Sequence, residues 1–275
     1  MDERTEYSTS LGSRILGGAG ALTLAPFRVD PTAIIPALAH RVDERGRLLV
    51  MCPAADAEFV GDAEVRLDGT KKAPELFIDI TVASLHGLGR VTWLDAADGT
   101  SAASADAATA DATAPFGHVP ESCVIGVVEL DKVLLHGPCG VATLDPRAIT
   151  AAATTAHRPF ADHEFDARDI VGRLTPDHLS ALLSDVLVER VPGFPCSEFE
   201  IRERVAAAAV QATPGFAPWI ADVDPAGITL ATMHHNRLTS VFVNFPEPVH
   251  TLDDLAGAVA ALAARTSARH ASPRI

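Results

Sequence analysis

The stretch ADVDPAGITLATMHHNRLTSVFVNFPEPVHTLDDLAGAVAALAAR, residues 221–265, decides the fold of the C-terminal half of the chain. Apolar side chains alternate with polar ones in two runs around residues 228–230 and 241–243, which is the period of a half-buried strand. The polar pair 236–237 lies between the two runs and suits a turn. The sequence therefore predicts a β-hairpin with one face toward a core and one face toward solvent.

A capped helix is predicted directly after this hairpin. Two prolines at residues 246 and 248 end the second strand, because proline has no N–H to donate to a sheet. Thr251 is placed to cap a helix, with Asp254 at the reciprocal position. Large apolar residues then recur every three or four positions over 252–262. We expect an amphipathic helix that packs against the hairpin.

The order D-x-D-x-x-G-I-x-L … V-x-V-N-F-P-E-P-V-x-T-L-D-D-L, from Asp222 to Leu255, resembles a domain of the HugZ-like haem-utilisation family. In that family the domain follows a flavin-reductase-like split barrel, and the same pairing occurs in the plastid protein that binds glutamyl-tRNA reductase. The likeness covers Asp169 to Ala264 and, in outline, Leu16 to Leu144. It implies an α+β fold, with a split β-barrel of the FMN-binding, pyridoxamine-phosphate-oxidase-like type over residues 1–156. A smaller α+β domain of helices packed on an antiparallel sheet would follow at 169–268.

The first half of the chain contains the patterns of several short strands, as a small barrel requires. Strands are expected at 21–24, 34–42, 47–52, 76–82, 89–94, 123–130, 132–135 and 141–144, with a helix at 8–18 and a short helix and turn within 58–68. Residues 95–115 are almost entirely Ala, Asp, Ser and Thr and cannot bury enough surface to offset their ordering entropy. We predict a mobile insertion there, within the barrel domain.

Helix signals open the second half. Thr175 can cap a helix that has Pro176 at its first position and an apolar stripe over 179–187. Ser197 and Glu200 have the spacing of a capping box, which predicts a second helix through residue 210.

Composition limits the classes of partner. A net charge of −14 over 275 residues repels phosphate backbones, so nucleic acid is not expected as a partner. No apolar run is long enough to cross a membrane, and the polar start MDERTEYSTS does not resemble a secretory signal, so we expect a cytoplasmic protein. The four cysteines are widely spaced and show no zinc-site spacing, which indicates buried reduced thiols.

The resemblance implies haem as the cofactor and points to candidate site residues. The family's first C-terminal helix opens with H-M-N-x-D-H, and the matching segment here is R-L-T-P-D-H, Arg173 to His178. A histidine in a first helical turn lies at the positive end of the helix dipole, which favours a neutral ring able to bind iron. His178 is therefore a candidate iron ligand with Asp177 as its acceptor, although a capping role explains it equally well. Arg173 cannot ligate a metal, which excludes a two-histidine arrangement at this motif.

His270 is the alternative ligand, because some haem-degrading relatives supply their axial histidine from a C-terminal tail. Flavin is not expected: where relatives carry a T-R-N-L-like run, this chain reads A-A-D-A-E at 54–58, and acidic side chains repel phosphate and propionate groups. We predict a homodimeric haem-binding protein, with haem degradation left open. A non-catalytic scaffold that holds a partner enzyme is the alternative, and a flavin-dependent reductase ranks last.

Overall fold

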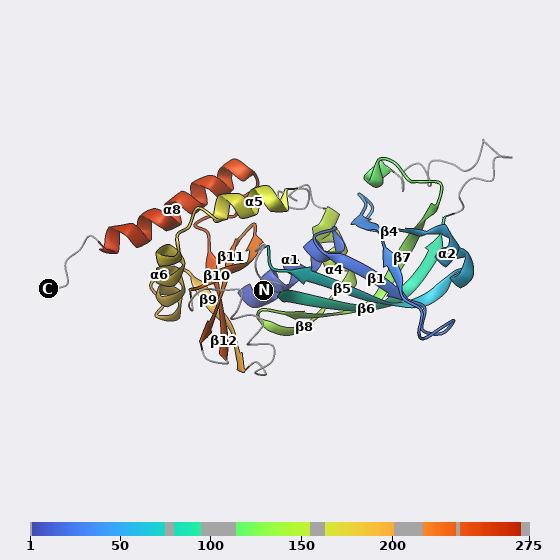
Figure 1. The fold of residues 1–275 in the computed structure, drawn as a ribbon, viewed down its shortest axis with the longest axis horizontal. Helices are drawn as coiled ribbons and strands as arrows, with labels where there is room; N and C mark the ends of the chain where they lie inside the picture. Colours follow the sequence, from blue (N-terminus) through green and yellow to red (C-terminus); the bar gives the residue numbers. More distant parts are fainter. Residues whose placement is uncertain are drawn as a thin grey trace.

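The computed structural model describes residues 2–74, 80–94, 114–154, 163–200, 217–234 and 237–270. It contains a nearly closed antiparallel barrel, followed by a four-stranded antiparallel sheet covered by helices (Figure 1). The first part comprises α1 (Glu3–Leu16), β1 (Ala21–Ala25), β2 (Ile35–Ala37), β3 (Ala39–Val42), β4 (Leu48–Pro53), α2 (Ala54–Val60), β5 (Ala63–Lys72), β6 (Thr81–Trp93), η1 (Ala114–Phe116), β7 (Cys123–Gly137), β8 (Gly140–Leu144) and α4 (Pro146–Thr154). The second comprises α5 (Glu164–Val171), α6 (Pro176–Leu187), β9 (Gly193–Glu200), β10 (Trp219–Asp224), β11 (Gly227–His234), β12 (Arg237–Asn244) and α8 (Leu252–His270).

A single segment brings the two ends of the barrel sheet together. The strands are ordered β2-β1-β5-β6-β7-β4-β3, with β8 added beside β7. The first and last strands of this path, β2 and β3, are separated in the chain only by Leu38, whose N–H donates to the Met51 carbonyl at 2.8 Å. Residues 35–42 therefore pair with β1 at one end and β4 at the other, which curls the sheet almost into a barrel.

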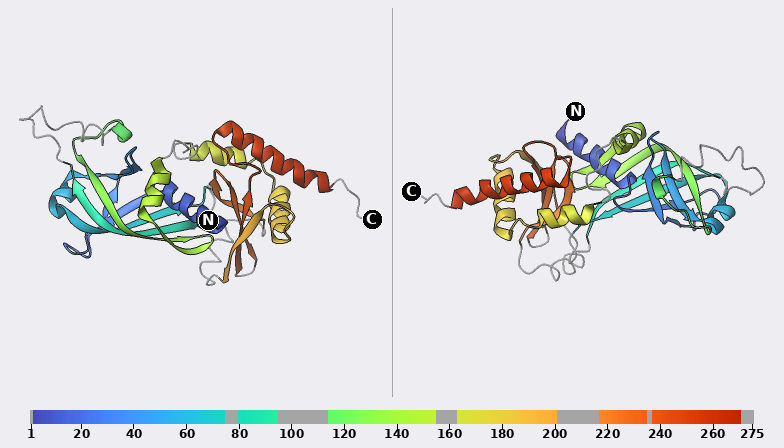
Figure 2. Two further views of the ribbon diagram at one scale, coloured as in Figure 1. Left: turned by 180° about the vertical axis from the view of Figure 1, so that it is seen from behind. Right: turned by 90° about the horizontal axis from the view of Figure 1, so that it is seen from above.

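The barrel interior is filled by alternate side chains of its strands and by α1. On β5, Val65 and Leu67 are fully buried while the residues between them face outward, as the two-residue period of a strand requires. Leu11 and Ile15 of α1 join the same apolar cluster. Figure 2 shows α1 at the boundary between the barrel and the second sheet. None of the described helices covers the outward side of β5 to β8 in these views.

Both faces of the second sheet are covered. In the strand order β10-β11-β12-β9, Ile228 and Val241 face the helices α5, α6 and α8 and pack in one cluster with them. The opposite side chains, Thr229 and Phe242, are also buried, because α1 lies against that face. The prediction of one solvent-exposed face was therefore wrong. Of the polar residues that indicated solvent, Thr229 is buried in contact with the Tyr7 hydroxyl of α1, and Ser240 is buried in hydrogen bonds with Ser197 and Pro138.

Several predicted elements are confirmed. The hairpins at 39–53 and 227–244 form, and α6 spans Pro176–Leu187 after its Thr175 cap. Thr251 N–H donates to Asp254, and Asp254 N–H donates back to the Thr251 hydroxyl, both at 3.0 Å. The α+β architecture of a barrel followed by a smaller helix-covered sheet is confirmed, while membership of the HugZ-like family stays a prediction. So do the domain boundaries at 1–156 and 169–268.

Other predictions need correction. Residues 81–93 and 123–137 are two continuous strands, β6 and β7, because they pair with each other through ten register positions and this pairing outweighs their internal glycines. The short helix expected within 58–68 lies earlier, at Ala54–Val60, and is followed by a strand. Ser197–Glu200 belongs to β9 and does not start a helix, since it pairs with β12. The predicted insertion at 95–115 lies outside the described residues apart from its last two positions, as do 201–216.

None of the described helices has the length and apolar character needed to span a lipid bilayer.

Candidate functional site

A buried ionic cluster joins the barrel half to the second sheet. Arg14 of α1 donates to both carboxylate oxygens of Asp222, at 2.9 and 2.6 Å, and approaches Asp224 at 3.0 Å. Lys71 of β5 contacts Glu164 of α5, and its Nζ lies 3.9 Å from Asp222. We call this cluster, together with Tyr7, the junction network: Tyr7, Arg14, Lys71, Glu164, Asp222 and Asp224.

The terminal nitrogens of Arg14 and the hydroxyl of Tyr7 are engaged within the protein, while Arg14 Nε is buried without a hydrogen-bond partner among the described residues. The Tyr7 hydroxyl lies 3.0 Å from the Thr229 hydroxyl and 3.3 Å from an Asp222 oxygen. Burial raises the pKa of Tyr7 well above its usual value, and the nearby Asp222 charge adds to the effect. Burial would also raise the pKa of Asp222, but the charge and hydrogen bonds of Arg14 outweigh it and hold this pKa below its usual value. The network therefore holds its charges in fixed pairs between the two halves.

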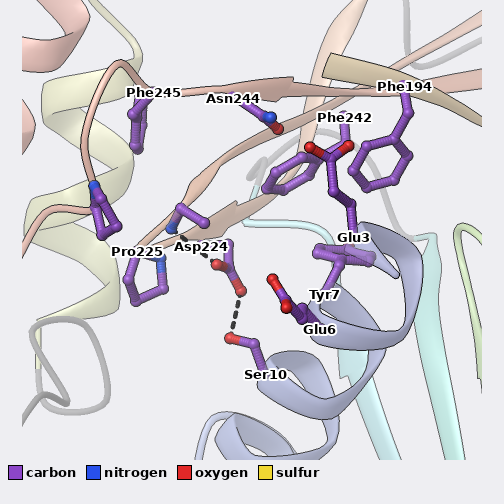
Figure 3. Close-up of a pocket in the computed structure, with 12 residues that line it drawn as sticks. Glu3, Glu6, Tyr7, Ser10, Phe194, Asp224, Pro225, Phe242, Asn244 and Phe245 are labelled. Carbon is purple, nitrogen blue, oxygen red and sulfur yellow. Dashed lines mark hydrogen bonds between the residues drawn. The ribbon is translucent and has the colours of Figure 1, made fainter. Parts of the chain in front are cut away.

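A pocket of about 380 Å³ opens beside this network (Figure 3). Its wall is aromatic: the Phe242 ring lies between the Tyr7 ring, which is tilted at a centre distance of 4.8 Å, and the Phe194 ring, which is stacked at 5.2 Å. Its charged lining consists of carboxylates, and the Glu3 and Glu6 side chains extend from α1 toward the pocket (Figure 3). No histidine, cysteine, lysine or arginine is among the described residues that line it, so this pocket offers no partner for propionates. Tyr7 is of a type that can bind haem iron, but its hydroxyl contacts Thr229 and Asp222 and its raised pKa disfavours the phenolate.

His178 occupies the third position of α6 and caps the helix. The Thr175 N–H donates to His178 Nδ1 at 3.2 Å, and the His178 N–H donates to the Thr175 hydroxyl at 3.3 Å. The other ring nitrogen, Nε2, lies 3.3 Å from the Ser267 hydroxyl of α8. Because Nδ1 accepts a hydrogen bond, Nε2 carries the proton in the neutral ring. Iron binding through Nε2 would require this cap to open.

The other residues predicted for the site lie around the same end of the helical layer. Arg173 and Asp177 are exposed beside His178. His270 ends α8, one helical turn after Ser267, so the helix carries it past the residue that contacts His178. This end of α8 points away from the barrel in Figure 1. The structure thus places the predicted residues near one another but distant from the barrel.

A different histidine is placed for ligand binding on the barrel. Residues on the outward side of β5 to β8 are aligned by direct strand pairing. We call this surface the barrel face: Arg66, Asp68, His86, Leu88, Lys132, Leu134, His136, Val141 and Thr143. His86 lies directly across from Asp68, and its Nδ1 is 2.7 Å from an Asp68 oxygen. Because a carboxylate only accepts, Nδ1 carries the proton and the neutral ring leaves Nε2 as an electron-pair donor.

The chemistry around His86 is that of a ligand site. Its Nε2 has no hydrogen-bond partner among the described residues. A groove of about 400 Å³ beside it is lined by Leu88, Leu134, Arg66 and Lys132, among others. Leu88 is 43% exposed, although a leucine is usually buried. An oriented histidine, apolar contact surface and two cations therefore share one face.

Sequence reasoning missed this site because it depends on strand register. Asp68 and His86 are far apart in the chain and belong to no motif. Only the pairing of β5 with β6 sets them opposite each other. The available signal was the polar and apolar alternation along 81–93, which places His86 and Leu88 on the same side of a strand.

Comparison with known proteins does not place the chain in a family. No protein-family model matches it, and no curated protein matches it. Among solved structures, a heme binding protein from Mycobacterium smegmatis aligns with a TM-score of 0.47 at 15% identity, covering 95% of this chain and 98% of that one. The protein Atu2129, of unknown function, from Agrobacterium tumefaciens str. C58 aligns with a TM-score of 0.34 at 14% identity, covering 93% and 94%. Likenesses this distant assign neither a family nor a function.

Proposed function

We propose that this protein binds haem on the barrel face, with His86 as the iron ligand. The observation that supports this most directly is the hydrogen bond from His86 Nδ1 to Asp68, which leaves Nε2 unprotonated in the neutral ring. A carboxylate in this position fixes the orientation of a histidine ligand and raises its basicity. The iron of a bound haem would supply redox chemistry or oxygen binding. No step of haem degradation is part of the proposal.

The remaining groups of the barrel face suit the rest of a haem. Leu88 and Leu134 flank His86 and offer apolar contact to a porphyrin ring. Arg66 uses its Nε for Asp68, at 2.8 Å, while its terminal nitrogens have no partner among the described residues. Arg66 and Lys132 are therefore positioned to pair with the two propionates. The acidic segment at 54–58, which argued against such pairing, lies in α2 and does not line this groove.

His178 and His270 remain the rival ligands. If His178 binds iron, the Thr175 capping hydrogen bond is lost, which costs about 1 kcal/mol. That cost is small beside a haem affinity in the micromolar range, about 8 kcal/mol. The cap alone therefore does not decide between the ligands. His86 is preferred because its free nitrogen, apolar neighbours and cations occur together.

A second copy of the chain is the proposed partner on the barrel face. Leu88 and Val141 leave apolar surface exposed there, at 43% and 63%, and a porphyrin ligated from one side needs a cover on the other. We retain the homodimer and the cytoplasmic location expected from the sequence as part of this proposal. Light scattering should give twice 28.8 kDa. Replacing Leu88 with Glu should shift the protein toward the monomer, while a wild type that is monomeric with haem bound would contradict the dimer.

A haem titration with single histidine variants tests the proposal. Wild-type protein should develop a saturable Soret band with a dissociation constant of about micromolar size. His86→Ala should weaken binding at least about tenfold, which corresponds to 1.4 kcal/mol. His118→Ala, an exposed histidine near the start of β7, is the matched control and should bind as the wild type does.

The other outcomes distinguish the alternatives. Loss of the Soret band in His178→Ala or His270→Ala, with His86→Ala unaffected, would move the site to the helical end. A wild type that takes up no haem would contradict the proposed function and favour the scaffold alternative, in which the protein holds a partner enzyme. Yellow flavin absorbance in the purified protein would instead support the reductase.

A further inference from the structure

The tip of the β7–β8 hairpin lies against the second sheet. Gly137 pairs with Gly140, so the turn consists of Pro138 and Cys139 alone. The Pro138 carbonyl accepts a hydrogen bond from the Ser240 hydroxyl of β12 at 3.4 Å. A short turn of the barrel is thereby held against the other half of the protein, close to the neighbouring strand β9.

A bulge in β9 sets Cys196 at the same place. Ser240 pairs with Ser197, but the next residue of β12, Val241, pairs with Pro195, so Cys196 is the extra residue of β9. Such bulges redirect a side chain out of the regular alternation. The Cys196 side chain joins the apolar cluster of the barrel half, and Cys139 packs against that cluster. Two cysteines from different halves of the chain are thus brought together.

The two thiols are neighbours in this apolar cluster and differ in exposure. A hydrogen bond with Cys139, together with burial, raises the pKa of Cys196 well above its usual value, so Cys196 remains a protonated thiol. Cys196 is 8% exposed, whereas Cys139 is half-buried and open to small solutes at the hairpin tip. Cys139 is therefore the thiol that an oxidant in solution meets first, and the thiolate is the nucleophilic form of a cysteine.

We propose that Cys139 and Cys196 are a redox-active pair, which hydrogen peroxide converts to a disulfide between the barrel hairpin and the second sheet. The Cys139 thiolate attacks one peroxide oxygen, the O–O bond breaks, and Cys139 becomes a sulfenic acid as hydroxide leaves and is protonated to water. The Cys196 sulfur then attacks the Cys139 sulfur, the S–O bond breaks, and a second water is released. Two thiols lose two electrons, and one peroxide becomes two waters.

The other two cysteines provide an internal control. Cys52 and Cys123 lie on the paired strands β4 and β7, where both are buried. Burial raises the pKa of Cys52 to about 12, and because Cys123 is buried as well, neither thiol of this pair is open to peroxide as Cys139 is. In the reducing cytoplasm expected from the sequence, the Cys139–Cys196 pair would rest as thiols and form the disulfide only under oxidant.

Peptide mapping of peroxide-treated protein tests the inference. The full-length chain is treated with hydrogen peroxide, its remaining thiols are alkylated, and the digest is analysed without reductant. The expected result is a single linked pair of peptides containing Cys139 and Cys196, which dithiothreitol removes. Titration should count two thiols lost for each chain.

Variants sharpen the test. Cys139→Ser and Cys196→Ser should each abolish the linked peptides, while the double variant Cys52→Ser/Cys123→Ser should retain them at the wild-type rate. Oxidation of Cys139 only to sulfinic acid, or links between other cysteines or between chains, would overturn the inference. If a serine variant fails to fold, the wild-type map decides the question alone.

Discussion

The junction network and the barrel face both gather charged side chains, but they treat them in opposite ways. At the junction, Asp222 is 1% exposed and receives two hydrogen bonds from Arg14, so its charge is committed to the fold. On the barrel face, Asp68 holds one nitrogen of His86 and leaves the other without a partner among the described residues. A cluster whose charges are paired with one another stabilises structure, and one with an oriented free electron-pair donor can bind a ligand.

The difference also shows why burial alone is a poor guide to function. The most strongly shifted pKa values at the junction belong to Tyr7 and its neighbours, and perturbed groups are often taken as signs of an active site. Here the shifts follow from desolvation and fixed ion pairs between α1 and β10. We therefore assign the junction network to holding the two halves together, and the barrel face to binding.

The largest effect is expected from breaking the junction network. Asp222→Ala should lower the free energy of unfolding by about 3–5 kcal/mol, because it leaves Arg14 and Lys71 as buried charges with fewer partners. Urea denaturation followed by circular dichroism measures this change. A loss below about 1 kcal/mol would show that the network is solvated and would remove the contrast with the barrel face.

The same network predicts how stability changes with pH. The folded-state pKa of Asp222 is depressed. Its contribution to the free energy of unfolding is therefore complete above the unfolded-state pKa of about 3.9 and is lost as the pH falls through the folded-state pKa. The folded-state pKa of Tyr7 is raised. Its contribution to the free energy of unfolding is therefore complete below the unfolded-state pKa of about 10 and is lost as the pH rises through the folded-state pKa.

The urea midpoint, measured across the pH range, tests both the loss of stability at low pH (the acid arm) and the loss at high pH (the alkaline arm). Tyr7→Phe should flatten the alkaline arm and leave the acid arm unchanged, since phenylalanine has no group to titrate. An alkaline arm of equal slope in Tyr7→Phe would contradict the assignment to this residue.

On the barrel face, a smaller effect is expected from removing the carboxylate behind the proposed ligand. Asp68→Asn should weaken haem binding by about 10- to 100-fold, the usual cost of losing the group that orients a metal-binding histidine. The Soret titration measures it. Asp131→Asn is the matched control, because Asp131 also lines the groove but makes no contact with His86 among the described residues. Equal losses in both variants would indicate a general charge effect.

How far the sequence predicted these regions depended on the range of the interactions. Thr251 and Asp254 are three residues apart, so the capping box could be recognised in the sequence and the helix after it could be predicted. Lys71, by contrast, belongs to no local pattern that predicts burial, yet it is 2% exposed because α5 brings Glu164 over it. Partners separated by many residues meet only through strand register and helix placement, which local periodicity does not encode.

The smallest stability effect is expected from the exposed ion pair on the barrel face. Arg66 is 53% exposed where it meets Asp68, so Arg66→Ala should change the free energy of unfolding by less than about 1 kcal/mol. The same variant should weaken haem binding, because a propionate partner is lost. A loss of stability as large as that of Asp222→Ala would place Arg66 in the fold and not in the site.

The state of the His86 ring tests the central claim most directly. Long-range proton–nitrogen spectra of the histidine rings should be recorded at about pH 8, above the usual titration range of histidine, before and after adding zinc protoporphyrin. We predict that the free protein shows the His86 proton on Nδ1, and that the His86 Nε2 signal shifts when the porphyrin binds, with the His178 and His270 rings unchanged. An unchanged His86 signal, together with a shifted His178 or His270 ring, would contradict the barrel-face site.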